Sequence, residues 1–128
     1  MTTIPAPTQP SGSALVTASA RLLQFTDTHL MRDPAGSIRG ARTLPRLQAC
    51  LAHAQRHFFP VDAMLLTGDV VHDEPEAYGA IDLLFGDLGT PVLVIPGNHD
   101  IPDEMRRQLG HAPFHVGGQW RTHNGWQL

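Results

Sequence analysis

The stretch PVLVIPGNHD, residues 91–100, joins a run of four aliphatic residues to a sharp turn and three polar side chains. Uninterrupted aliphatic runs of this kind are typical of buried strands in parallel sheets. A proline and a glycine end the run, since proline cannot donate to a sheet and glycine allows a tight change of direction. Asn98, His99 and Asp100 therefore stand together at the end of a predicted strand.

Two earlier apolar runs, residues 21–26 and 62–67, end in polar residues in the same way. Asp27 and His29 follow the first run, and Asp69 follows the second. Both runs are short enough for strands and are followed by turn-forming residues. Three polar clusters thus follow three predicted strands.

Apolar residues recur at helical spacing between and after these strands. One helix is predicted from an N-cap at Thr43 to a point before Pro60, a second from residue 75 to a stop at Gly89, and a third over residues 102–109. Strands that alternate with helices predict an α/β fold, with a parallel sheet covered on both faces. Ligands of such sheets bind beyond the carboxyl ends of the strands, which is where the three clusters fall.

The residue types in the clusters point to a metal site. Asp27 and His29 are alternate residues, which point the same way in an extended segment and can grip one cation. Asp69 can bridge two cations through its two oxygens, and Asn98 adds a neutral oxygen. Mixed nitrogen and oxygen ligands suit Mn, Fe, Zn or Co, and two such ions about 3.5–4 Å apart can activate water for attack on phosphorus.

His99 is predicted to be catalytic rather than a ligand, because an imidazole beside the metals can donate a proton to a leaving oxygen. Asp100 is predicted to hold the ring of His99 in the required tautomer. Two neighbours are left open: Asp73 either supports the site or favours the start of the following helix, and His72 either lines the pocket or faces water.

Each motif taken alone has an ordinary structural explanation. An aspartate after a strand is usually a turn former or a helix cap, and a lone asparagine is often a turn residue. Three such clusters, each at the end of a predicted parallel strand, favour the metal site over this explanation.

The series of clusters resembles the calcineurin-like metallophosphoesterase superfamily. The segments LLQFTDTHLMRDPAG, LLTGDVVHDEPEAY and PVLVIPGNHD are similar, more closely, to its class III cyclic-nucleotide phosphodiesterase branch. The resemblance covers roughly residues 21–110. It implies the N-terminal portion of an αββα sandwich, two divalent or mixed-valence metal ions, and a small phosphodiester substrate, with cyclic nucleotides favoured.

The resemblance also implies a role for each matching residue. Asp27 and His29 bind the first metal, Asp69 bridges, Asn98 binds the second metal, and His99 is the catalytic histidine.

The family pattern continues with an H-H segment and a G-H-x-H segment, and this sequence has neither. The histidines His111, His115 and His123 are expected to be loop or surface residues. An alternative function stays open for this reason: a truncated, inactive remnant that binds at most one metal weakly, or that associates with another chain through an uncovered sheet face or an unpaired edge strand. A homo-oligomer is left open as well.

Length and composition set the remaining expectations. The chain has 128 residues and a net charge of −3, which suggests one domain and no nucleic-acid surface. Residues 1–20, rich in Pro, Thr, Ser and Ala, are predicted to be a flexible leader, and residues 21–128 an incomplete phosphoesterase domain. The single cysteine, Cys50, is expected to be buried within a helix. No apolar run is long enough to span a membrane and no signal peptide is recognisable, so a cytoplasmic location is predicted.

Overall fold

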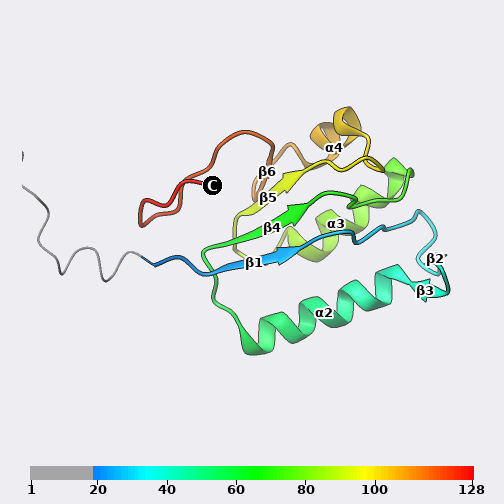
Figure 1. The fold of residues 1–128 in the computed structure, drawn as a ribbon, viewed down its shortest axis with the longest axis horizontal. Helices are drawn as coiled ribbons and strands as arrows, with labels where there is room; N and C mark the ends of the chain where they lie inside the picture. The colour runs from blue at the N-terminus through cyan, green and yellow to red at the C-terminus, as the bar shows by residue number, and fades with distance from the viewer. Residues whose placement is uncertain (1–18) are drawn as a thin grey trace, which may run out of the picture.

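A sheet of four parallel strands, in the order β1-β4-β5-β6, forms the centre of the computed structural model (Figure 1). The structure describes residues 19–128, so nearly all of the leader predicted for residues 1–20 lies outside the described residues. The strands are β1 Leu22–Phe25, β4 Ala63–Thr67, β5 Val92–Ile95 and β6 Phe114–Val116.

The strands pair so that their carboxyl ends meet at one edge. Leu66, near the end of β4, pairs with Phe25 of β1 and with Val94 of β5. The parallel sheet and its alternation with helices are as predicted.

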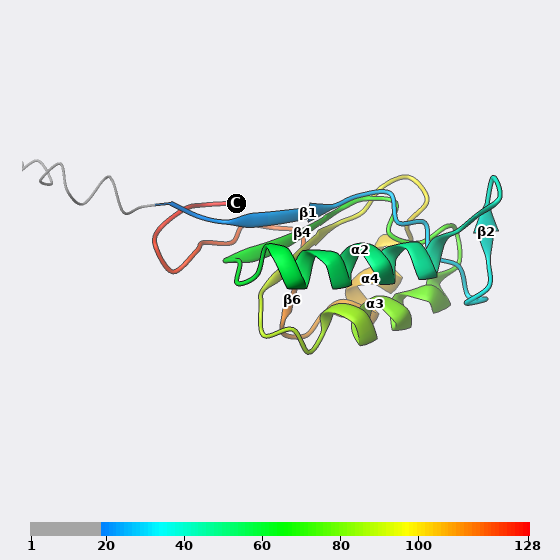
Figure 2. The ribbon, with the colours of Figure 1, turned by 90° about the horizontal axis from the view of Figure 1, so that it is seen from below.

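The helices follow the strands in turn: α2 Thr43–His57 after β1, then a 3₁₀ turn η1 Pro75–Ala77 leading into α3 Tyr78–Phe85 after β4, and α4 Pro102–Leu109 after β5. Parallel connections cross over with one handedness, and the strand order advances in one direction without reversal. All of these helices therefore lie on the same face of the sheet (Figure 2).

The prediction that helices cover both faces was wrong for residues 19–128. The second face, which we call the open face, carries Leu65 and Thr67 of β4 and Leu93 and Ile95 of β5. These residues, together with the C-terminal Leu128, line a groove of about 280 Å³. Ile95 is 51% exposed, which shows how little covers this face.

The helix-covered face holds the core. Its strand residues are Met64, Leu66, Val92 and Val94, all at most 1% exposed. The helices contribute the buried residues Leu47, Leu51, Ile81, Phe85, Met105 and Leu109. Each side chain of this size contributes about 1.5–3 kcal/mol when fully buried, so this one-sided core fixes the sheet beneath the site.

Element boundaries differ from the predictions in four places. Helix α2 has Arg42, not Thr43, as its N-cap, and α3 ends at Phe85, before the predicted stop at Gly89. A small hairpin, β2 Ser37–Ile38 and β3 Ala41–Arg42, lies in a predicted loop, and β6 lies in a tail without an assignment. Cys50 is exposed because it lies beside, not within, the buried stripe of α2. Among residues 19–128, no helix is both long and apolar enough to cross a bilayer.

Candidate metal centre

The loops after β1 and β4 run side by side beyond the sheet. The backbone N–H of Asp27 donates to the carbonyl of Gly68 at 3.0 Å, and that of His29 donates to the carbonyl of Asp69 at 2.9 Å. The two strands thus remain paired after they cease to be regular, which brings the three predicted ligands of these loops together.

The backbone at these positions is left-handed. Asp27, His29 and Asp69 have φ angles of 55°, 46° and 48°, and Asp73 has 64°. A left-handed conformation is uncommon outside glycine and, like other backbone strain, tends to cluster at functional sites. Asp27 and His29 therefore come together through two left-handed residues, and not through the extended segment that we predicted.

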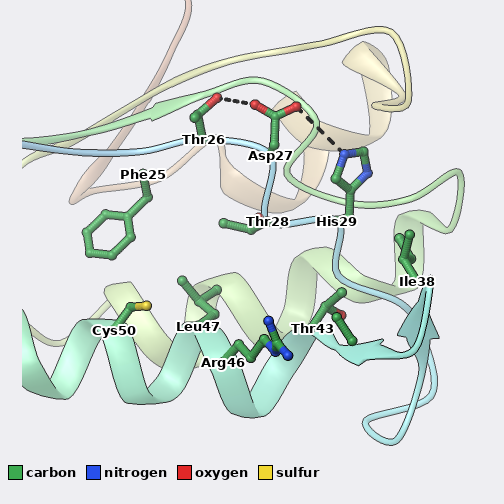
Figure 3. Close-up of a pocket in the computed structure, with 11 residues that line it drawn as sticks. Phe25, Thr26, Asp27, Thr28, His29, Ile38, Thr43, Arg46, Leu47 and Cys50 are labelled. Atoms are coloured by element: carbon green, nitrogen blue, oxygen red, sulfur yellow. Dashed lines mark hydrogen bonds and ion pairs between the residues drawn. The ribbon is translucent and has the colours of Figure 1, made fainter.

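The side chains of these loops form one group of potential ligands. Nε2 of His29 lies 3.7 Å from Oδ1 of Asp27 and 3.7 Å from Oδ2 of Asp69. The close-up in Figure 3 shows the carboxylate of Asp27 turned toward the ring of His29. Ligand bonds of about 2.0–2.2 Å place neighbouring donor atoms roughly 3–4 Å apart. The donor set and its spacing therefore fit a borderline first-row ion.

The loop after β5 brings Asn98 to the same carboxylate. One end of the Asn98 amide lies 3.3 Å from both oxygens of Asp69. With nitrogen at that end the amide donates to the carboxylate, and with oxygen there two oxygen ligands face one another. The backbone N–H of His99 also donates to Oδ1 of Asp69, at 2.9 Å. Asp69 thus has both His29 and Asn98 as neighbours.

Gly97 permits this close approach. A Cβ atom at Gly97 would stand 2.3 Å from Oδ1 of Asp69 and 2.4 Å from its backbone nitrogen. Any side chain at this position would therefore push the loop after β5 away from Asp69.

His99 has a carboxylate partner that differs from the predicted one. Its Nδ1 lies 3.1 Å from Oδ1 of Asp73, and its ring stacks on that of His72 with the ring centroids 4.5 Å apart. His72, Asp73 and His99 form a second group that could hold an ion. The sequence left the roles of Asp73 and His72 undecided, because their contacts depend on the left-handed turn at Asp73.

Asp100 holds the loops and not the ring of His99. Its oxygens accept hydrogen bonds from the backbone N–H groups of Gly97 (2.8 Å), Val70 (3.2 Å) and Val71 (3.1 Å), and from the hydroxyl of Tyr78 (2.9 Å). Burial raises the pKa of Tyr78, so this hydroxyl stays protonated and donates. The expectation that Asp100 orients His99 is corrected, because Asp73 makes that contact.

The remaining histidines of the C-terminal part lie apart from the centre. His111 contacts Asp82 at 3.3 Å, His123 contacts Asp62 at 3.5 Å, and the ring of His115 lies 5.9 Å from that of Trp120. Neither potential metal group found among residues 19–128 includes any of the three.

A pocket of about 340 Å³ opens between β1 and α2, beside the first group. Asp27 and His29 lie at its upper rim, Phe25 points from β1 toward α2, and Leu47 and Arg46 face it from the helix (Figure 3). The walls are mostly apolar, so a ligand that binds the centre could place an apolar or aromatic part here.

Comparison with known proteins identifies the family. The sequence model of the calcineurin-like phosphoesterases matches residues 20–127. The chain belongs to this family. Its members are metal-dependent phosphoesterases, in agreement with the ligand groups at the carboxyl ends of the strands.

The chain is also similar to individual proteins, at 31–33% sequence identity. The chain is 33% identical over 108 residues to a probable cyclic nucleotide phosphodiesterase of Synechococcus sp., with 84% of this chain and 41% of the relative covered. It is 32% identical to the 3',5'-cyclic adenosine monophosphate phosphodiesterase CpdA of Haemophilus influenzae, with 84% and 39% covered, and 31% identical to CpdA of Escherichia coli K12, with 81% and 40% covered. The chain thus spans about two fifths of the length of these relatives.

Proposed function

We propose that this protein binds two metal ions, of the Mn, Fe, Zn or Co class, and hydrolyses phosphodiesters, with cyclic nucleotides as the favoured substrate. The observation that carries the proposal is the meeting of Asp27, His29 and Asp69 around one point, with Asn98 against the same carboxylate. The names of the relatives, which are cyclic nucleotide phosphodiesterases, support the substrate class.

Each residue has a defined task in this proposal. Asp27 and His29 hold the first ion, Asp69 bridges to the second, and Asn98 binds the second. When bound, such ions supply Lewis acidity to the phosphoryl oxygens and lower the pKa of water at the site.

His99 acts on the substrate. With its Nδ1–H donated to Asp73, the ring is fixed by that bond and its Nε2 is left to interact with a phosphoryl or leaving oxygen. Asp100 acts on the backbone, since it fixes the loops after β4 and β5 relative to each other.

A second candidate is a chain that binds one ion weakly, through Asp27, His29 and Asp69, and pairs with another chain. The open face supports it, because exposed apolar sheet residues favour association.

Metal content and turnover test the proposal together. We expect metal to remain bound to the wild-type chain after gel filtration, to be lost in Asp69→Asn, and to be unchanged in His99→Ala. Hydrolysis of a chromogenic phosphodiester with Mn²⁺ should fall by about 10²- to 10⁴-fold in His99→Ala. His115→Gln, outside both ligand groups, is the matched control.

The outcomes separate the two candidates. Two ions per chain with turnover of the diester and of cyclic AMP support the phosphodiesterase. One ion or fewer without turnover supports the second candidate, and full metal content in Asp69→Asn contradicts both.

A further inference from the structure

A histidine that the proposed function does not use, His72, lies against His29. The two Nδ1 atoms are 3.1 Å apart, and the rings meet at an interplanar angle of 66° with their centroids 5.2 Å apart. Two ring nitrogens at this distance need one proton between them. With two protons the N–H groups would repel, and with none two lone pairs would face each other.

The proposed metal position beside His29 determines which ring carries that proton. Its other nitrogen, Nε2, faces the oxygens of Asp27 and Asp69, both at 3.7 Å. A neutral imidazole has one N–H, and a nitrogen that binds a metal must be the one without it. With a metal on Nε2, His29 would therefore carry its proton on Nδ1, and Nδ1 of His72 would accept it.

The backbone of His72 is anchored and its ring stacks on one neighbour. Its backbone N–H donates to the carbonyl of Leu30 at 2.9 Å, and the neighbouring Val71 is fully buried. The face of the ring stacks on His99 at 25°. The acceptor is thus preformed on the side of His29 away from the carboxylates.

From these contacts we propose that His72 is a positioning residue: it accepts the Nδ1–H of His29 and so keeps Nε2 of His29 unprotonated and aimed at the first metal position. The inference rests on the proposed metal centre. Partners of this kind, which hold the far nitrogen of a metal-binding histidine, typically change metal affinity 10- to 100-fold.

One other role for His72 competes with this one. His72 also belongs to the group with Asp73 and His99, in which it would itself bind an ion. Its Nδ1 cannot both accept from His29 and bind a metal, so the two roles exclude each other at that atom.

Nitrogen-15 spectra of the histidine rings test the hydrogen bond in the wild-type 128-residue chain with bound Zn²⁺. We expect the proton of His29 on Nδ1 and that of His72 on Nε2. A proton on Nδ1 of His72 in the metal-bound chain would overturn the inference.

Metal titration tests the consequence. His72→Leu removes the acceptor, and His72→Gln supplies a side-chain oxygen in its place. We expect the affinity of the first Zn²⁺ or Mn²⁺ to fall roughly 10- to 100-fold in His72→Leu and to recover most of this loss in His72→Gln. His57→Leu, an exposed histidine on α2, is the control and should match the wild type.

The alternatives give distinct results. If His72 is a ligand, both variants lose one ion per chain while the other ion binds with unchanged affinity, and the inference falls. Wild-type affinity in both variants also overturns it. If the wild-type chain binds no metal, the proposed function fails and the inference falls with it. A chain that binds metal but carries the proton of His72 on Nδ1 overturns the inference alone.

Discussion

Strands β5 and β6 are neighbours in the sheet and end at the same edge, yet their exits differ. After β5, residues 96–100 form a compact loop whose Asp100 accepts four hydrogen bonds. After β6, Gly117 and Gly118 lead away with φ angles of 69° and 75°, and no residue of either ligand group follows. The carboxyl end of a parallel strand is therefore not enough to make a site. The loop after β5 differs in its buried carboxylate, Asp100, which holds the backbone of the loops after β4 and β5 together.

Removing that acceptor should have the largest effect. Asp100→Ala leaves three backbone N–H groups and the Tyr78 hydroxyl without their partner, and each buried group left unsatisfied costs about 1–3 kcal/mol. We expect the free energy of unfolding, measured in urea, to fall by at least about 3 kcal/mol.

Asp103→Ala is the matched control, because its side chain is 99% exposed and pairs only with Arg106 in the ion pairs described. It should change stability by less than about 1 kcal/mol, because an exposed acidic residue in the first turn of a helix contributes about 0.3–1 kcal/mol. A similar small loss in Asp100→Ala would show that the loop after β5 does not depend on its anchor.

The second-largest effect is expected from a substitution that crowds the loop after β5. Gly97→Ala places a Cβ 2.3 Å from the Asp69 carboxylate, and overpacking of this kind costs about 1–3 kcal/mol. Metal affinity should fall as well, because Asp69 must move. Gly79→Ala in α3, where a Cβ meets nothing within 4 Å, should instead raise stability by about 0.5–1 kcal/mol.

The hydroxyl of Tyr78 allows a test by pH. Burial raises the pKa of Tyr78 above its ordinary value of about 10, so the folded state disfavours the ionised form. The contribution of the protonated Tyr78 hydroxyl to the free energy of unfolding is complete below pH 10. It is lost as the pH rises from there toward the pKa of Tyr78 in the folded state. Tyr78 is the one tyrosine of the chain, so absorbance of tyrosinate reports it alone. We expect that absorbance to appear well above pH 10, or together with unfolding; titration near pH 10 in the folded chain would contradict this.

The smallest effect on stability is expected for His111, which lies shortly before β6. The carbonyl of Ala112, followed by the charge of Asp82, raises the pKa of the exposed His111. The contribution of protonated His111 to the free energy of unfolding is complete below the ordinary histidine pKa of about 6.5. It is lost as the pH rises through the pKa of His111 in the folded state. His111→Gln should therefore lower the melting temperature slightly at pH 5.5 and not at pH 8.5. An equal shift at both pH values would exclude a role for the charge.

Much of the centre could be predicted from sequence. Aliphatic runs ending in polar residues located Asp27, His29, Asp69 and Asn98 at one edge of the sheet, because parallel strands place their carboxyl ends together. The partner of His99 could not be predicted, since it depends on a left-handed turn at Asp73 and on backbone donors that occupy Asp100 from 29 and 30 residues away.

The position of the helices was missed for a different reason. Periodicity shows that a helix has an apolar stripe, but not which face of the sheet it covers. The strand order decides this, because an order that advances without reversal puts every crossover on one side.

The left-handed backbone at Asp27, His29, Asp69 and Asp73 has a consequence for how this site can change through mutation. Besides glycine, the residues that adopt this conformation most readily are asparagine, aspartate and histidine, and the last two are also common metal ligands. Each position is thus restricted twice, by its backbone and by its chemistry. A descendant protein that loses metal binding can carry asparagine or glycine at these four positions at little cost in stability. A β-branched residue there would strain the backbone. Substitution spectra at these positions should therefore remain narrow even after activity is no longer under selection.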